Sequence, residues 1–138
     1  MDIRYPAKIE KQADGKYFVQ FVDFDDIFSE GDSEEEAQFN AVEALSGMLA
    51  WKLDNEVSIP PPSKNIKRAV YIAPDSKTQA AMLLRLARGE RTLSDLARAL
   101  ETSWPAAQRL EDAKHWPSLK TLERAAAALG KRLVLVLE

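Results

Sequence analysis

Three consecutive prolines, inside the stretch "IPPPSKN" at residues 59–65, constrain the fold of this chain more than any other feature. Proline has a fixed φ and no amide hydrogen, so a helix does not continue through such a run. The stretch favours an extended connection. It therefore divides the 138 residues into two parts, and this length suits one ordinary domain or two small ones.

The two parts carry opposite charge. Residues 1–66 contain 6 Lys and Arg against 14 Asp and Glu, a balance of −8. Residues 67–138 contain 13 Lys and Arg against 8 Asp and Glu, a balance of +5. Opposite balances indicate two tasks with two kinds of partner, whereas the alternative is that charge simply fluctuates over short windows.

The overall composition excludes several classes of protein. Hydrophobic residues make up 46% and charged residues 30%, which is typical of a globular chain. No run of about 18 apolar residues is present, and the opening "MDIRYPAKIEK" lacks the apolar centre of a signal peptide. There is no cysteine for a disulfide or a thiolate metal site. We expect a cytoplasmic protein without a membrane partner, a cofactor or a metal.

The acidic part predicts a small antiparallel sheet with one helix. The stretches "IRYPAKIEKQ" and "YFVQFVDF" read as strands, and the Asp-Gly between them favours a hairpin. A third short strand is expected from Ile27 to Glu30. Ser33 and Glu36 then form a predicted capping box for a helix whose apolar residues recur at helical spacing. After the prolines, "RAVYIAP" is a strand that can close the same sheet, so the first domain is predicted over residues 1–74.

The basic part, residues 75–138, predicts helices followed by one strand. The first helix, "DSKTQAAMLLRLARGE", has Ala80, Leu83, Leu84 and Ala87 on one face. The others are "TLSDLARALE", a helix from Ser103 to about residue 113, and "SLKTLERAAAALG". The terminal "KRLVLVLE" is expected to be a strand. The predicted fold class is therefore α+β, with a sheet-and-helix domain followed by a helical domain.

Two of these helices are joined by Glu101 and Thr102 alone, which is the spacing of a helix-turn-helix. Ser103 is the predicted N-cap of the second helix, and Trp104 and Pro105 fall in its first turn, where proline is tolerated. The first turn position often holds glycine at positive φ. Glu101 in the same geometry would cost about 1 kcal/mol, and the alternative is a turn of different construction.

This arrangement predicts DNA binding, because the start of such a helix meets base edges in the major groove. Gln108 is expected to pair with adenine, Arg109 with guanine, and Trp104 or Ala106 to touch a thymine methyl group. The predicted DNA-binding residues are Thr92, Ser94, Ser103, Trp104, Pro105, Ala106, Gln108, Arg109, Lys114 and His115. The alternative is an ordinary helical hairpin with Trp104 in the core.

The last strand carries an apolar run that needs cover on both faces. Its residues are Leu133, Val134, Leu135, Val136 and Leu137. We expect them to pair with the same strand of a second chain and form a dimer, as operator-binding proteins of this kind usually require. The alternative is that the strand folds back on its own helices. A further contact between the sheets would give a tetramer.

Both parts resemble known families. The stretches "YPAKIEK", "GKYFVQFVDFDDIFSEGDSEEEAQFNAVEAL" and "IPPPS" resemble the HicB antitoxin family. The stretches "TLSDLARALETSWPAAQRLEDA" and "PSLKTLERAAAALG" resemble the Cro/C1-type helix-turn-helix family. The resemblance implies a type II antitoxin. Its first domain, a reduced ribonuclease-H-like fold, would bind and block a HicA-type toxin, and its second would bind the operator DNA of its own operon as a dimer.

The resemblance implies that the HicA-type toxin is a ribonuclease that cleaves mRNA. A protein that binds RNA is expected to have a basic surface, and an acidic surface on its partner would complement it. The predicted toxin-binding residues are Asp23, Phe24, Asp25, Asp26, Phe28, Glu30 and Asp32, with the two phenylalanines as apolar anchors. The alternative is a solvated acidic loop with both phenylalanines in the core.

Carboxylates in a ribonuclease-H-like fold also suggest a two-metal nuclease. Asp23, Asp25 and Asp26 are the only obvious cluster, and they crowd into one loop instead of spreading over several strands. The sequence has no nucleophile–base pair and no glycine-rich phosphate loop. We therefore expect no enzymatic activity. The remaining alternative is a stand-alone repressor whose first domain senses a small ligand.

Overall fold

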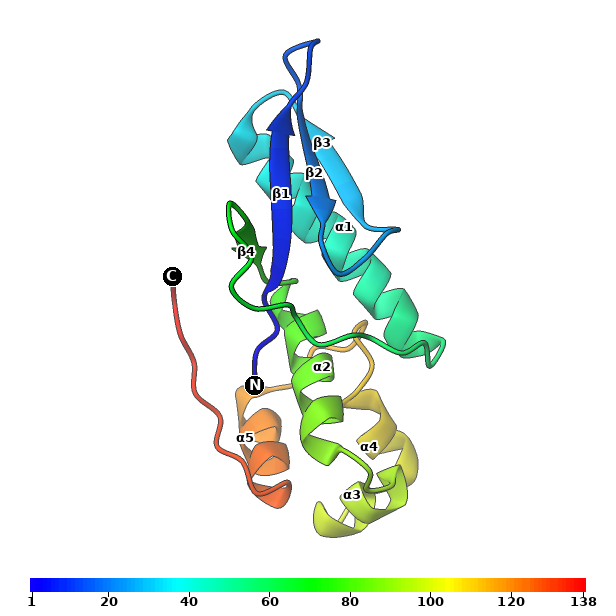
Figure 1. The fold of residues 1–138 in the computed structure, drawn as a ribbon. Coiled ribbons are helices and arrows are strands. Elements are labelled where there is room, and N and C mark those ends of the chain that lie inside the picture. The colour runs from blue at the N-terminus through cyan, green and yellow to red at the C-terminus, as the bar shows by residue number, and fades with distance from the viewer. The chain divides into compact units, whose positions relative to one another are not determined.

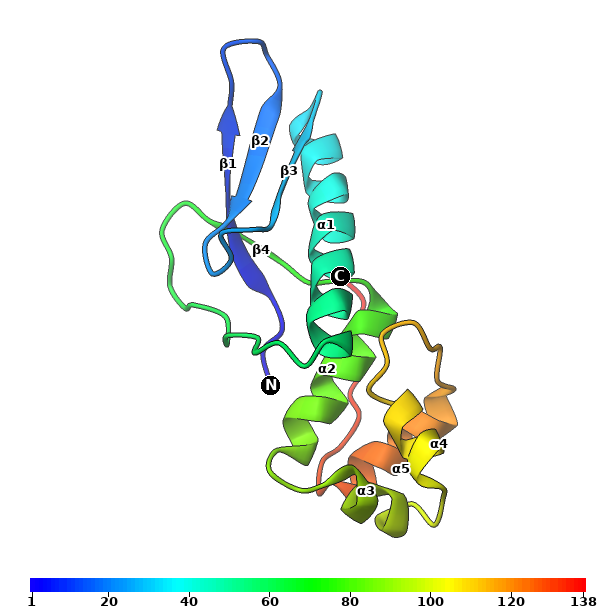
Figure 2. The same cartoon turned by 90° about the vertical axis from the view of Figure 1, so that its right-hand side faces the viewer.

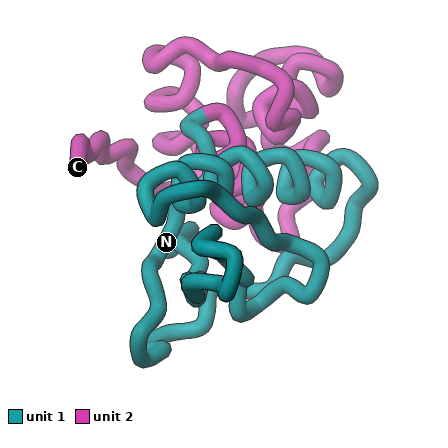
Figure 3. The backbone as a smooth tube through the Cα atoms, turned by 90° about the horizontal axis from the view of Figure 1, so that it is seen from above, with its two compact units in different colours: residues 1–76 teal, residues 77–138 magenta.

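A computed structural model describes all 138 residues, which form two compact units, Met1–Ser76 and Lys77–Glu138 (Figure 3). The α+β fold class is confirmed, since the strands all belong to the first unit and helices dominate the second. The proline run lies inside the first unit and not between the units, because the strand that follows it belongs to the first sheet.

The first unit is built on a four-stranded antiparallel sheet of order β3-β2-β1-β4 (Figure 1). The strands are β1 (Tyr5–Lys11), β2 (Tyr17–Phe21), β3 (Phe28–Gly31) and β4 (Val70–Ile72). The predicted hairpin between β1 and β2 is confirmed. Gly15 has φ +88°, and the Gln12 amide donates to the Lys16 carbonyl at 2.7 Å. β4 closes the sheet against β1, as the sequence predicts.

Helix α1 (Glu34–Asp54) covers one face of this sheet (Figure 2). Its buried side chains follow one ridge with a residue in every fourth position: Ala37, Ala41, Leu45, Leu49 and Leu53. Gly31 at the end of β3 is required for this packing, because a Cβ there would lie 2.5 Å from the Ala37 nitrogen.

The N-cap of α1 is confirmed, but the predicted capping box is wrong in one respect. The Ser33 hydroxyl accepts from the Glu36 amide at 3.1 Å. The Glu36 carboxylate accepts in return from the amide of Asp32, at 3.4 Å, and not from that of Ser33. The Glu36 side chain therefore bonds to the amide of Asp32, the residue before the N-cap, and not to the amide of the N-cap itself.

The proline segment is fastened to the first unit by side chains from three places. The Tyr5 hydroxyl donates to the Pro60 carbonyl at 2.7 Å, and the Tyr71 hydroxyl donates to the Ser63 carbonyl at 3.0 Å. The Asp23 carboxylate accepts from both the amide and the hydroxyl of Ser63, the former at 2.9 Å. The segment is thus part of the fold.

The second unit is helical. It contains α2 (Ser76–Arg88), whose first residue belongs to the first unit, then α3 (Leu93–Ala99), α4 (Trp104–Arg109) and α5 (Leu119–Ala128). Its core consists of Leu84, Leu96, Ala97, Ala107, Leu110, Ala125 and Leu129. The predicted face of α2 is only partly correct. Leu84 is in the core, but Thr78, Ala81 and Met82 are the other buried residues in place of Ala80 and Leu83.

Two predictions about secondary structure in the second unit are wrong. Helix α4 ends at Arg109, four residues early, because the next amides bond to carbonyls three residues back, as Glu111 does to Gln108 at 3.0 Å. Residues 131–138 have no regular secondary structure. A strand needs a neighbouring strand to bond with, and the second unit contains none. None of the helices combines the length and the hydropathy that a membrane span requires.

Candidate functional site

Helices α3 and α4 form the helix-turn-helix of the second unit. α3 begins at Thr92 with a full capping box: the Asp95 amide donates to the Thr92 hydroxyl at 3.0 Å, and the Thr92 amide donates to the Asp95 carboxylate at 3.1 Å. The hydrogen bond from the Thr92 amide, and after it one from the Thr92 side chain, hold the pKa of the Asp95 carboxyl below its ordinary value. The start of α3 is therefore rigidly defined.

The turn between the two helices has the left-handed geometry expected from glycine-containing relatives of this motif. Glu101 has φ +54°. Its amide donates to the Arg98 carbonyl at 3.1 Å, and the Thr102 amide donates to the Ala97 carbonyl at 2.9 Å. This pair of bonds is a Schellman motif, in which the left-handed position normally holds glycine. The strain expected for Glu101 is therefore present, and the turn has its usual shape.

Helix α4 presents polar and aromatic side chains to solvent. Ser103 caps it by accepting from the Ala106 amide at 3.3 Å, and Pro105 occupies its first turn. Trp104 is 46% exposed, so the alternative that places it in the core is wrong. Ala107 alone anchors the helix in the core. Exposed side chains among the predicted DNA-binding set are Thr92, Ser94, Ser103, Trp104, Pro105, Gln108, Arg109 and Lys114, while Ala106 and His115 are half-buried.

A buried ion cluster behind α4 was missed by the sequence analysis. The Glu111 side chain is only 4% exposed and bonds to Arg88 twice, at 2.6 Å from Nε and 2.9 Å from Nη2. Arg85 Nε lies 3.4 Å from the same carboxylate. The hydrogen bond to Glu111 raises the pKa of Arg88 above its ordinary value. The cluster connects the residues just after α4 to α2. The one signal of it in the sequence is that Glu111 lies between the apolar residues Leu110 and Ala113, which are buried.

The predicted acidic residues of the first unit divide into bound and exposed groups. Asp23 is bound to Ser63 and so positions the proline segment. Asp26 lies 3.3 Å from Lys52 Nζ, and Glu30 lies 3.9 Å from Lys16 Nζ. Asp25 and Asp32 are exposed. Most of this charge therefore faces solvent beside β3, with Asp23 as the exception.

The two predicted aromatic anchors differ in their surroundings. Phe24 is 4% exposed and packs against the Tyr5 ring at 4.9 Å between centroids, so its assignment as a surface anchor is wrong. The loop turns it under the sheet, where apolar burial is favourable. Phe28 is 56% exposed and lies 6.0 Å from the ring of Phe18. Phe18 was missed, although it follows from the alternation along β2, which buries Val19 and Phe21 on the other face.

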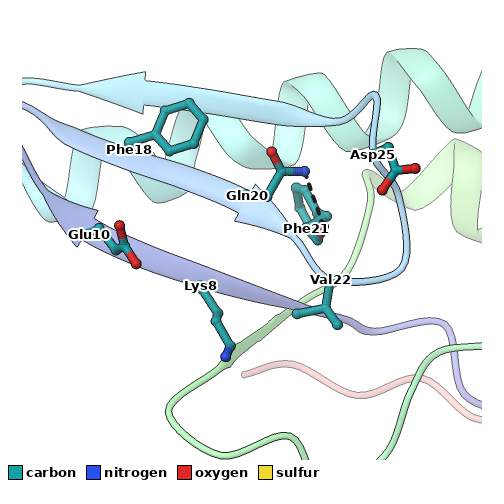
Figure 4. A pocket seen from close by; sticks show the side chains of 7 residues that line it. All are labelled: Lys8, Glu10, Phe18, Gln20, Phe21, Val22 and Asp25. Atoms are coloured by element: carbon teal, nitrogen blue, oxygen red, sulfur yellow. Dashed lines mark hydrogen bonds between the residues drawn. The ribbon is translucent and has the colours of Figure 1, made fainter.

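The open face of the sheet carries a shallow pocket of about 460 Å³ beside this aromatic pair (Figure 4). It is lined by Lys8, Glu10, Phe18, Gln20, Phe21, Val22 and Asp25. Gln20 holds its rim in place, since Nε2 donates to the carbonyls of Phe24 at 2.8 Å and Ile27 at 3.1 Å. No group of three or more His, Cys, Asp or Glu side chains in the structure could hold a metal ion.

The predicted dimerisation residues lie in the C-terminal segment. Leu133 is half-buried, while Val134, Leu135, Val136 and Leu137 are exposed. A second pocket of about 380 Å³ separates this segment from α5, and Leu119, Ala127, Leu133 and Leu135 contribute to its wall. The single chain thus leaves a continuous apolar run open to solvent.

These features define a protein with a sheet-and-helix unit of acidic character followed by a helix-turn-helix unit. A family model described as the HicB-like antitoxin of bacterial toxin-antitoxin systems matches residues 4–73. The chain is 27% identical over 137 residues to antitoxin HicB 1 of Photorhabdus laumondii, covering 99% of this chain and 88% of that protein. It is 30% identical over 137 residues to antitoxin HicB of Escherichia coli, covering 98% and 99% respectively. The chain belongs to the HicB-like antitoxin family.

Proposed function

We propose that this chain neutralises a HicA-type toxin by direct binding through its first unit and represses its own operon through its second. The role in a toxin-antitoxin system comes with the family. The finer assignment of one partner to each unit rests on the surfaces described above and on their opposite charge.

The acidic side of the first unit supports the toxin-binding assignment. Residues 1–66 have a balance of −8, and Asp25, Asp26, Glu30 and Asp32 carry part of it on the surface next to the exposed Phe28. A basic ribonuclease would be steered to such a surface, and an exposed aromatic side chain supplies the apolar contact that long-range charge does not. Phe18 extends this contact, in place of the buried Phe24.

The exposed side chains of α4 carry the DNA-binding assignment. Trp104, Gln108 and Arg109 project from a short helix that is fixed by its cap, its turn and the Glu111 cluster. Three different hydrogen-bonding and apolar side chains on one exposed helix suit readout of base edges in the major groove. Exposed Ser94 and Lys114 are suited to phosphate contacts beside it.

A dimer completes the proposal for the second unit. Operators are usually read as two half-sites, which requires two copies of the recognition helix. The apolar run Val134–Leu137 is exposed along its whole length, so burying it against a partner would be favourable. We propose that it pairs with the same segment of a second chain, where each would supply the neighbouring strand that the single chain lacks.

The experiment that tests the function uses one variant and two readouts. Trp104→Ala is expected to weaken binding to the operator of the chain's own operon and to leave relief of HicA-induced growth arrest unchanged. If the unaltered chain does not relieve the arrest, the antitoxin assignment fails. If Trp104→Ala unfolds the second unit, or leaves operator binding unchanged, the DNA-binding assignment of α4 fails.

The pocket on the open face favours one other candidate, a repressor whose first unit senses a small ligand. Its lining combines two aromatic rings with side chains of both charges, as ligand sites often do. A ligand-sensing repressor would bind the operator but would not relieve the growth arrest caused by the HicA-type toxin. Co-expression of the chain with the toxin therefore separates the two functions.

A further inference from the structure

The solvent-facing side of α1 carries two large aromatic side chains that lie outside the core. Phe39 is 65% exposed and Trp51 is 55% exposed. Together with Glu43 and Gly47 they occupy every fourth position, so they form a ridge that runs opposite the buried ridge of the same helix. We call these four residues, Phe39, Glu43, Gly47 and Trp51, the outer stripe. The two aromatic positions are separated by about 18 Å along the helix axis.

Gly47 in the outer stripe is not required by the chain itself. A Cβ at this position would have no atom within 4 Å, and its φ is not left-handed. Glycine in the interior of a helix destabilises it relative to alanine. The residue therefore weakens α1 without serving packing or backbone geometry in the single chain. It leaves a notch between the two aromatic side chains, where the backbone of the helix is open to close approach.

The side chains around the outer stripe are mostly acidic, which favours a basic partner. Glu34, Glu35, Glu36 and Glu43 are all exposed on α1. Lys52 is the only basic residue in the helix, and it turns away to Asp26, with its side chain 12% exposed. Carboxylates next to exposed aromatic rings suit arginine and lysine, which pair with the former and stack on the latter. A second copy of this acidic face would instead be repelled.

The outer stripe is continuous with the acidic residues already assigned to the toxin. Asn40, next to Phe39, donates to the Glu30 carbonyl at 2.9 Å. Lys52, next to Trp51, lies 3.3 Å from Asp26. The adjacent ridge of α1 therefore contacts β3 and the loop before it along most of its length. The outer stripe faces away from the sheet, so one basic partner reaches the loop, the edge of β3 and the stripe together by extending around this edge of the unit, and Phe18 and Phe28 lie beyond it on the open face of the sheet.

We propose that the outer stripe is part of the toxin-docking surface, and that the toxin approaches α1 most closely at Gly47. Basic side chains of the toxin stack on Phe39 and Trp51 and pair with Glu43. This assignment rests on the proposed function, because it names the surface through which the same toxin is held.

Gly47→Ala gives the sharpest test, because stability and binding are expected to change in opposite directions. The unbound variant should unfold at a higher temperature than the unaltered chain, since alanine favours the helix and its methyl group meets no atom. Its affinity for the HicA-type toxin, measured by titration calorimetry, should fall about 10-fold. Phe39→Ala and Trp51→Ala should each lower the affinity about 30-fold, as truncation of an interface anchor does.

Trp116→Ala is the matched control, because it removes a tryptophan of the second unit that is 66% exposed. It should leave the toxin affinity unchanged. If the unaltered chain does not bind the toxin at all, the proposed function fails with this inference. If the chain binds the toxin but Gly47→Ala and the two aromatic variants bind equally well, only the outer stripe is rejected. A lower unfolding temperature for unbound Gly47→Ala would also reject it, because the glycine would then serve the fold.

Discussion

The Nε atom of Arg88 lies 2.6 Å from Oε2 of Glu111, and this carboxylate is almost completely shielded from water. The pair joins α2 to the residues that immediately follow α4. A charge removed from water in this way stabilises the fold only while its partner is present.

Glu111→Ala is therefore expected to destabilise the second unit by about 3 kcal/mol, because it leaves Arg88 without its counterion. The measurement is denaturant unfolding followed by tryptophan fluorescence. Glu123→Ala, which removes an exposed carboxylate from α5, should change stability by less than about 0.5 kcal/mol. Equal effects of the two variants would mean that the Arg88–Glu111 pair contributes nothing to the fold.

Glu101→Gly should stabilise the second unit by about 1 kcal/mol. Glu101 has φ +54°, a conformation that costs a side-chain-bearing residue energy and costs glycine nothing. Glu123→Gly in α5 is the contrasting control, and it should destabilise by about 1 kcal/mol. Thermal unfolding of both variants checks the prediction. A destabilised Glu101→Gly would show that the turn tolerates glutamate for another reason.

The stability of the first unit should fall as the pH rises from about 10 to about 12. Burial, and then the nearby carboxylates of Asp23 and Asp2, raise the pKa of Tyr5 to about 12 in the folded chain from an ordinary value of 10.0. The unfolded chain thus loses this proton first, and the stability present below pH 10 is lost through this window. Unfolding measured at several pH values should show the decline. Tyr5→Phe should show less of it, and an unchanged profile in that variant would assign the decline to other groups.

Arg109→Ala should weaken operator binding by about 1–3 kcal/mol and relax specificity at one base pair, because Arg109 is exposed on the proposed recognition helix. Competition binding against operators with single base changes measures both effects. Lys114→Ala should instead weaken binding to all sequences equally, as loss of a phosphate contact does. A uniform loss for Arg109→Ala would make it a phosphate contact as well.

Deletion of residues 132–138 should abolish dimerisation and, with it, tight operator binding. The segment carries the exposed apolar run, and its removal leaves the core of the second unit untouched. Sedimentation analysis reports the oligomeric state, and helical circular dichroism confirms that the truncated chain is folded. A dimer that survives the deletion would place the interface elsewhere.

The parts of the fold that depend on local chemistry were predictable from the sequence. The hairpin at Gly15 and the caps at Ser33 and Ser103 all follow from neighbouring residues. What failed depends on distant contacts. Phe24 lies in a loop, where alternation does not predict which way a side chain points, and it is buried against distant residues such as Tyr5 and Lys52.

The same distinction holds for the candidate sites. The exposure of Trp104 could be argued from its place in a helix-turn-helix, whereas Glu111 looks like any polar residue near the end of a helix. Its counterion, Arg88, lies 23 residues away in the sequence. The strand expected at residues 131–138 has the right composition, but a strand forms only beside another strand, and the second unit contains none.

The hydrogen bonds that fasten the proline segment bear on how this protein can be divided for experiments. Cutting the gene at the prolines would discard Ser63, Tyr71 and the whole of β4, and with them the partners of Asp23 and one edge of the sheet. It would also remove the Pro60 carbonyl, which accepts the hydrogen bond from the Tyr5 hydroxyl. A fragment intended to carry toxin binding alone should therefore run through the end of β4, and a protease that cleaves within residues 59–65 should damage the first unit more than it separates the two.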